Sequence, residues 1–196
     1  DYIDLINVHD IEFSDLEMVC KETLPALTEL KTKGLVKHVG ITNLTLRHFK
    51  YVINNVPKGT VESILSFCHY CLNDDALIDY LDFFEQNDVG IINASPFSMG
   101  LLTERGAPEW HPAPKPLQDL CRKAVQHCMD KGKNIEQLAV SFSVSNPRIA
   151  TTLFSTTRSS SVLQNIKWAN EPTDEELLAE VRKILEPRFR DTWLNS

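Results

Sequence analysis

The sequence lacks both a run of basic residues and a long apolar segment. Its 20 Lys and Arg residues are scattered among 27 Asp and Glu residues, and the formal net charge is −7. Because nucleic acids and anionic membranes attract clustered positive charge, we expect neither as a partner. No apolar stretch approaches the roughly 20 residues of a membrane span, and no signal-peptide pattern is present. A cytoplasmic location is the simplest expectation.

Glycine-rich phosphate-binding turns are missing as well. The chain contains 7 glycines, and none of them forms a GxGxxG or Walker pattern after a strand-like segment. Such turns are the signature of nucleotide-binding sheets of the open, doubly wound type. We therefore do not expect a Rossmann fold.

Metal-binding patterns are equally sparse. The five cysteines are odd in number and lie among apolar neighbours, which favours a reducing compartment. Cys68 and Cys71 form one CxxC in a strand-like segment, where residues three apart face opposite sides, and no second CxxC completes a zinc site. Without an HxH pair, a metal-dependent barrel hydrolase would have only His9, Asp10 and His69. We expect no metal site.

The sequence does contain a regular alternation of strand-like and helix-like segments. At 42% hydrophobic and 24% charged residues, it can form a sizeable core. The expected strands are residues 1–10, 35–43, 63–74, 89–95 and 149–155. The expected helices are residues 16–30, 45–56, 76–87, 117–128, 134–146, 160–170 and 173–185. Such alternation predicts a parallel sheet with crossover helices.

Two of the predicted helices begin with a capping-box pattern. Ser14 precedes Glu17 by three residues, and Thr173 precedes Glu176 by the same spacing. We therefore expect the hydroxyl groups of Ser14 and Thr173 to cap these helices.

Polar residues follow the C-terminal end of every predicted strand. These ends read His9-Asp10, Thr42-Asn43, His69-Tyr70, Ser95-Pro96 and Ser155-Thr156-Thr157-Arg158. In a βα-barrel the reactive face lies at the C-terminal ends of the strands. The sequence therefore favours an α/β fold of the (β/α)8 TIM type, incomplete because only about five βα units are present.

Each of these candidate residues has a structural and a functional interpretation. His9 is either a satisfied residue of the barrel rim or a group that polarises a substrate oxygen. Asn43 is either a turn residue or a carboxamide that pairs with another amide. His69 fits the barrel lining, whereas Trp110 and His111 lie in a long loop and are either exposed or part of a lid.

Five segments together carry a family resemblance over nearly the whole chain. They are DYIDLINVHD, LPALTELKTKGLVKHVGITN, ILSFCHYCLND, INASPFSMGLLTERGAPEWHPAP and GKNIEQLAVSFSVSNPRIATTLFSTTRSSSVLQNI. The sequence resembles the aldo-keto reductases, and within them the L-galactose dehydrogenase group. The resemblance implies a (β/α)8 barrel that binds NAD or NADP without a Rossmann fold. It also implies hydride transfer between the nicotinamide and C1 of an aldose, as when L-galactose becomes a lactone.

The resemblance assigns site residues by position. His9 matches the catalytic histidine at the end of the fourth strand of the family's barrel. Thr42 and Asn43 match the pair that holds the nicotinamide carboxamide, and Ser66 or Phe67 replaces the glutamine that many relatives place opposite. The other cofactor-binding positions run along the ring, pyrophosphate and adenosine, and are Ser95, Phe97, Met99, Gly100, Leu101, Ser155, Thr157, Arg158, Ser161 and Asn165.

The resemblance also indicates the ligands. Trp110 and His69 are the candidate contacts to a small sugar substrate. Ser155 and Ser161 stand where relatives carry cations for a 2′-phosphate, which favours NAD because the phosphate would lose a charge-assisted hydrogen bond. Arg158 is close enough in sequence to leave NADP open. The implied oligomeric state is a monomer or a weak dimer.

The family's catalytic tyrosine, the lysine that lowers its pKa and the aspartate beside that lysine belong to the first three βα units. Residues 1–196 are thus expected to form a single partial barrel domain from the fourth strand onward, inactive alone. The alternatives are a truncated isoform or binding fragment without catalysis, which must cover an open sheet edge, and, more remotely, the metal-dependent hydrolase.

Overall fold

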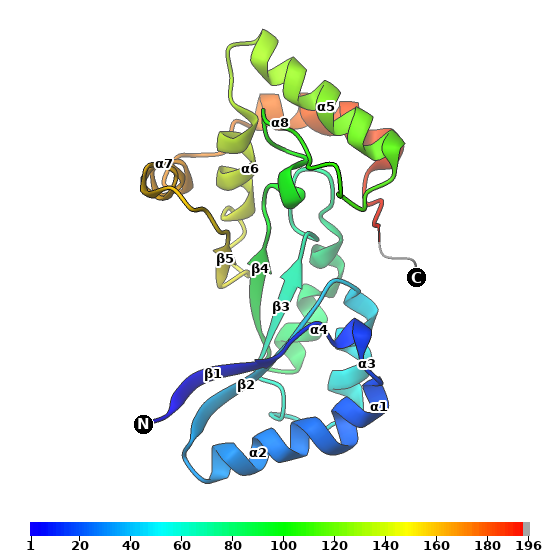
Figure 1. The fold of residues 1–196 in the computed structure, drawn as a ribbon, viewed down its shortest axis with the longest axis vertical. Helices are drawn as coiled ribbons and strands as arrows, with labels where there is room; N and C mark the ends of the chain where they lie inside the picture. Colours follow the sequence, from blue (N-terminus) through cyan, green and yellow to red (C-terminus); the bar gives the residue numbers. More distant parts are fainter. Residues whose placement is uncertain (194–196) are drawn as a thin grey trace. The chain divides into compact units, whose positions relative to one another are not determined.

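The computed structural model describes residues 1–193, which divide into two compact units (Figure 1). Unit 1 consists of Asp1–Phe67 and Leu77–Ile92, and unit 2 of Cys68–Ala76 and residues 93–193. The five strands follow the order β1-β2-β3-β4-β5 in one sheet. They alternate with helices along the chain, which confirms the predicted parallel α/β arrangement of an incomplete (β/α)8 barrel. No helix within residues 1–193 is long and apolar enough to cross a membrane.

Unit 1 contains three paired strands, the helices that cover them and the first residues of a fourth strand. The strands β1 (Ile3–Val8), β2 (Val36–Asn43) and β3 (Ser63–Phe67) pair in parallel, with Asn7, Gly40 and Ser63 opposite one another. Figure 1 shows β1 and β2 running side by side, with α2 alongside. The other elements of this part of the chain are η1 (Ile11–Phe13), α1 (Leu16–Met18), η2 (Val19–Thr23), α2 (Leu24–Thr32), α3 (Leu46–Asn54), η3 (Ala76–Tyr80), α4 (Leu81–Gln86) and β4 (Gly90–Ala94).

Apolar side chains on one face of β2 and β3 build the core of unit 1. Val39, Ile41 and Ile64 alternate with more polar neighbours and are almost fully buried. From the helices, Phe49 of α3 meets Phe84 of α4 edge to face, with ring centroids 6.1 Å apart. Helices α2 and α3 both pack against β2, so this strand is fixed in place up to the polar residues at its end.

Two pairs of helices dominate unit 2. Helix α5 (Lys115–Asp130) packs against α8 (Glu175–Leu185), and α6 (Ile135–Ser143) packs against α7 (Ser159–Ala169) (Figure 1). Cys121 and Cys128, seven residues apart on α5, are both fully buried core residues. The remaining elements are η4 (Ser98–Gly100), β5 (Thr151–Leu153) and η5 (Glu186–Arg188).

Both predicted capping boxes are wrong by one residue. Asp15 caps the first helix and accepts a hydrogen bond from the backbone N–H of Glu17, and Asp174 caps α8 by accepting from Leu177 N–H. An aspartate side chain reaches the same backbone donors as serine or threonine, and its negative charge also suits the positive end of the helix dipole. The caps therefore move to the aspartate that directly follows each predicted hydroxyl residue.

The predicted strand at residues 63–74 is wrong in its second half. The strand ends at Phe67, because Cys68 adopts a left-handed backbone with φ of 60°. Cys71 then forms an antiparallel bridge with Asp74. The CxxC therefore lies in a tight loop, and burial raises the pKa of both thiols far above the ordinary value.

Candidate functional site

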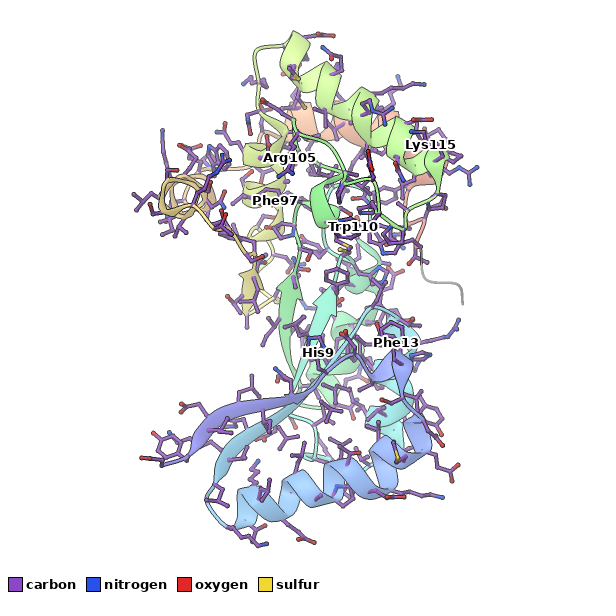
Figure 2. All side chains as sticks on the ribbon, in the orientation of Figure 1. His9, Phe13, Phe97, Arg105, Trp110 and Lys115 are labelled. Atoms are coloured by element: carbon purple, nitrogen blue, oxygen red, sulfur yellow. The ribbon has the colours of Figure 1, made fainter. Side chains whose placement is uncertain are left out.

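His9 directly follows β1 and presents its imidazole to solvent (Figure 2). The side chain is 79% exposed, and Nδ1 lies 3.1 Å from Oδ2 of Asp10. Asp10 has a φ of 50°, in the left-handed region that aspartate tolerates better than most residues. This turn ends the strand and brings the carboxylate to the ring. The Asp10 carboxylate therefore lies within ion-pairing distance of the imidazole.

Thr42 fastens the same turn from the neighbouring strand. Its Oγ1 accepts a hydrogen bond of 2.8 Å from the backbone N–H of Asp10 and lies 3.4 Å from the Asp10 carboxylate. Thr42 is buried at the end of β2, so its hydroxyl has little freedom. The structure thus brings together His9, Asp10 and Thr42 from two adjacent strands of unit 1.

Asn43 is held by protein groups at both ends of its carboxamide. Its Oδ1 accepts from the backbone N–H of Glu12 at 3.1 Å, and its Nδ2 donates to the carbonyl oxygen of Thr45 at 2.7 Å. Oε1 of Glu12 in turn accepts from Leu44 N–H at 3.2 Å. In this conformation Asn43 ties the loop after β1 to the loop after β2. A ligand amide would have to replace one of these bonds.

Glu12 is a site-lining residue that the sequence interpretation missed. Its Oε2 is buried and has no hydrogen-bond partner among the described residues, and burial raises the pKa of its carboxyl. No motif marks this position. Only the pairing of the two loops shows that Glu12 lies beside Asn43.

Ser66 lies on the other face of the sheet from Thr42. In the pairing of β2 with β3, Thr42 is opposite Leu65, and Asn43 is opposite Ser66. Because successive residues of a strand point to opposite faces, the partner of Thr42 on its own face is Leu65. The Oγ of Ser66 is fully buried without a partner among residues 1–193.

In unit 2, an unusual backbone shapes the loop after β4. Ser95, Ser98, Met99 and Gly100 all have positive φ angles, between 49° and 104°. At Gly100 a Cβ atom would lie 3.3 Å from the carbonyl oxygen of Gly106, so a side chain would crowd the returning loop. The loop therefore folds back on itself directly after the strand, and Figure 2 shows Phe97, Arg105 and Trp110 along it.

His111 fastens this loop from within. Its Nε2 donates to the carbonyl oxygen of Ser98 at 3.1 Å, and its Nδ1 accepts from the backbone N–H of Ala113 at 3.0 Å. These bonds require the neutral ring, and burial lowers the pKa of His111. Trp110 beside it is 70% exposed and stacks on the His111 ring at 6.4 Å between centroids. Trp110 is therefore the exposed member of the pair, and His111 the structural one.

His69, the other candidate substrate residue, is a buried side chain with a charged partner. Its Nδ1 lies 2.8 Å from Oδ2 of Asp74, and Oδ1 of Asp74 accepts from the backbone N–H of Ala76 at 2.9 Å. The ring thus stabilises the loop that follows β3. This matches the structural interpretation of His69 that the sequence left open.

A cavity of about 270 Å³ in unit 2 collects several of the predicted cofactor-binding residues. Its wall is formed by Phe97, Thr103, Glu104, Asn134, Glu136, Ser155, Thr156, Ser161, Gln164, Asn165 and Trp168. Phe97, Ser155, Ser161 and Asn165 were expected at a cofactor. The predicted residues Ser95, Met99, Gly100, Thr157 and Arg158 are not part of this wall.

Of the remaining wall residues, Thr156 belongs to the polar run that the sequence placed at the end of the last strand, whereas the others carry no recognisable motif and were missed. Thr103 and Glu104 also border a second cavity of about 360 Å³, which Leu101, Arg105 and Arg122 help to line. The one sequence signal among the missed residues is Asn134, a residue type that favours helix N-caps. In the structure its side chain caps α6 by accepting from Gln137 N–H at 2.9 Å. Helix caps of this kind place a polar residue at a defined point of a loop.

No group of three or more His, Cys, Asp or Glu side chains within residues 1–193 is arranged to hold a metal ion. The hydrolase alternative, which needs such a group, therefore gains no support from the described part of the chain.

Comparisons with known proteins agree with this geometry. Residues 1–186 match the model of the aldo/keto reductase family. The chain is 46% identical to L-galactose dehydrogenase of Arabidopsis thaliana over 98% of its own length and 62% of that protein. It is 26% identical to D-arabinose 1-dehydrogenase of Saccharomyces cerevisiae, over 74% of its own length and 45% of that protein. The chain thus spans less than two thirds of these relatives.

A solved structure shows the same fold. The holo form of an aldo-keto reductase from Bacillus halodurans superposes with a TM-score of 0.74 at 20% sequence identity, covering 100% of this chain and 62% of that one. The parallel βα units, the histidine after β1 and the family match over nearly all residues lead to one conclusion: the chain belongs to the aldo-keto reductase family.

Proposed function

We propose that this chain is part of a dehydrogenase that oxidises an aldose at C1 with NAD. The observation that carries the proposal is the cavity of unit 2, where Phe97, Ser155, Ser161 and Asn165 meet. The family resemblance assigns these four residues, taken from two distant segments, to a nicotinamide cofactor. The 46% identity to L-galactose dehydrogenase supports an aldose as the substrate.

The cavity has the properties that the adenosine half of a dinucleotide requires. It is concave, with one aromatic ring at Phe97, another at Trp168 and several hydroxyl and carboxamide groups between them. Asn165 is buried, and it lies in the cavity wall as a polar residue that could meet a ligand. When bound, the cofactor supplies the carbon that accepts hydride from the sugar.

The wall of this cavity favours NAD over NADP. A 2′-phosphate is normally held by Arg or Lys, which form charge-assisted hydrogen bonds to its oxygens. None of the described residues that line the cavity is Lys, Arg or His. By the family resemblance, Ser155 and Ser161 occupy the positions of the cations that hold a 2′-phosphate. Arg158, which the sequence left as a possible phosphate ligand, is not part of the wall.

His9 would bind the reacting hydroxyl group of the sugar. Asp10 lies 3.1 Å from Nδ1 of the imidazole, so Nε2 is the ring nitrogen left for the substrate oxygen. The exposure of the ring leaves room for a sugar. Trp110 is a second candidate contact, since an exposed indole offers an apolar face to the C–H groups of a sugar ring. For His69, its burial and its bond to Asp74 support a structural role instead.

The roles proposed for Thr42, Asn43 and Ser66 require a local change. The hydroxyl of Thr42 and both ends of the Asn43 carboxamide are already bonded within the protein, and Ser66 is fully buried, on the face of the sheet that it shares with Asn43. Binding of a nicotinamide carboxamide by Asn43 would exchange the Glu12 or Thr45 contact for the ligand. Asn43 then makes as many hydrogen bonds as before, so the exchange should change the binding free energy little.

The experiment uses a chimera in which the segment of the Arabidopsis L-galactose dehydrogenase that corresponds to the family's first three βα units precedes residues 1–196. We expect NADH to form from L-galactose, and His9→Ala to lower kcat by about 100-fold or more, the range for loss of one group that hydrogen-bonds the reacting oxygen in the transition state. The matched control is His38→Ala, which removes an exposed histidine that pairs with Glu62 on the same sheet. A His9→Ala chimera that retains the kcat of the control would refute the proposal.

A further inference from the structure

One carboxylate in the wall of the unit 2 cavity has an unused oxygen. Glu136 is the second residue of α6 and lines the cavity. Its Oε1 accepts a hydrogen bond of 3.1 Å from the backbone N–H of Glu104. Its Oε2 is buried and has no hydrogen-bond partner among residues 1–193. A buried carboxylate oxygen without a donor is costly, so such a group in a native protein calls for a ligand or a function.

The surroundings of Glu136 hold it in this place. Asn134, the N-cap of α6, donates from Nδ2 to Oε1 of Glu104 at 3.0 Å. Glu136 therefore accepts from the backbone of Glu104, and the side chain of Glu104 accepts from Asn134, the residue that caps α6. Both contacts lie at the start of a helix that packs against its neighbours. The terminal torsion of a glutamate is soft, so a small rotation can turn Oε2 toward a donor in the cavity while the side chain stays anchored.

The charge of this wall is negative. Glu104 and Glu136 both line the cavity, and none of its described lining residues is a cation. A phosphate group placed here would be repelled by two carboxylates, whereas a hydroxyl group could donate a hydrogen bond to Oε2. In dinucleotide sites of a different fold, an acidic side chain accepts a hydrogen bond from the 2′-hydroxyl of the adenosine ribose in the same manner.

We propose that Glu136 selects the cofactor by accepting a hydrogen bond from the unphosphorylated adenosine ribose of NAD and by repelling the 2′-phosphate of NADP. The inference rests on the proposed function, since it takes this cavity to be the adenosine site. It adds a specificity-determining residue on α6, a helix that none of the predicted cofactor-binding positions occupies.

The test measures binding and not turnover. ADP-ribose and 2′-phospho-ADP-ribose are titrated calorimetrically into the chain, because both probes contain the adenosine half and lack the nicotinamide. We expect the unmodified chain to bind ADP-ribose at least tenfold more tightly than its 2′-phosphate. Glu136→Ala should weaken ADP-ribose binding about tenfold, as expected for the loss of one hydrogen bond to a charged group.

Glu136→Gln separates the two parts of the proposal. Glutamine keeps the size and one acceptor oxygen but removes the charge, so affinity for the 2′-phosphate should rise about tenfold while affinity for ADP-ribose changes less. Glu175→Gln is the matched control, because Glu175 is exposed in the first turn of α8 and does not line the cavity. This control should leave both affinities unchanged.

The outcomes distinguish the inference from the proposed function. If the chain binds both probes and the Glu136 variants keep the ratio of the unmodified chain, the role of Glu136 is overturned while the adenosine site stands. If the unmodified chain binds neither probe, the proposed function and the inference fall together. Thermal unfolding followed by circular dichroism checks that each variant is folded, and Glu136→Gln, which preserves side-chain volume, remains decisive if Glu136→Ala unfolds.

Discussion

The substitution Asp75→Asn should destabilise unit 2 strongly, because one carboxylate there receives two guanidinium groups. Oδ2 of Asp75 accepts from Arg182 and Oδ1 accepts from Arg190, each at 2.8 Å. The Asp75 side chain is 7% exposed, and each arginine side chain is 35% exposed. The Arg182 guanidinium also lies 5.0 Å from the centre of the Phe142 ring. The carboxylate thus joins the loop after β3 to α8 and the segment that follows it.

The magnitude follows from these exposures. Removing one partner of a fully buried ion pair costs about 3–5 kcal/mol, mainly because the other charge is left without a partner. Here water can reach about a third of each arginine, so part of that cost is recovered by hydration. Asparagine also retains one acceptor oxygen but turns an N–H group toward a guanidinium. We expect the free energy of unfolding to fall by about 2–3 kcal/mol.

Urea denaturation measures this loss, since urea is uncharged and does not screen the ion pairs as guanidinium chloride would. The matched control is Asp119→Asn. Asp119 accepts from Arg122 at 3.0 Å, but both side chains are largely exposed on α5, so the loss should be at most about 0.5 kcal/mol. If the two variants lose the same stability, the reasoning about burial is refuted.

Three further predictions concern packing, pH and thiol reactivity. Gly40→Ala should lower the free energy of unfolding in urea by about 1–3 kcal/mol, because the new Cβ would collide with Oδ1 of Asn7. Gly90→Ala meets only the carbonyl oxygen of Glu62 at 3.5 Å and should be tolerated. The unfolded state binds a proton at His111 more readily than the folded state, so stability should be complete above about pH 6.5 and decline as the pH falls toward the lowered pKa of the folded protein. His111→Gln should make this decline shallower, and an unchanged pH profile would count against the explanation. Burial raises the pKa of Cys121 to about 12, so iodoacetamide should not modify it at neutral pH until the chain is unfolded, which mass spectrometry can follow.

The alternation of strands and helices was predictable because each element buries a periodic set of apolar residues. Val39 and Ile41, two residues apart in β2, and Cys121 and Cys128, seven apart in α5, show this, because each pair shares a buried face of its element. The details that failed depend on single backbone torsions or on a choice between neighbours. The strand that ends at Phe67 illustrates the first, since nothing in its apolar pattern foretells the positive φ of Cys68.

The helix starts illustrate the second. Ser14 and Asp15, or Thr173 and Asp174, are both chemically able to cap a helix, and the backbone geometry decides which side chain reaches the free N–H groups. A spacing rule alone cannot make this choice. The spacing rule locates the start of a helix to within one residue. It does not determine which side chain accepts the hydrogen bond from the helix backbone.

The candidate site was predictable only where a family pattern marks it. His9, Phe97, Ser155, Ser161 and Asn165 lie in segments that resemble the family. The other parts of the site depend on side chains brought together by folding. Glu104 and Glu136 are 32 residues apart and become partners through a backbone hydrogen bond, and Glu12 meets Asn43 in the same way. Such pairs have no local signature, so the sequence could not indicate them.

The central claim, that this chain is part of an NAD-dependent enzyme acting at C1 of an aldose, is tested most directly by isotope transfer. The chimera is incubated with NAD and L-galactose that carries deuterium at C1, and the reduced dinucleotide is analysed by mass spectrometry. The account predicts that the deuterium of the sugar appears in the reduced nicotinamide ring. Reduced dinucleotide that contains no deuterium, or a sugar that keeps its C1 deuterium, would contradict it.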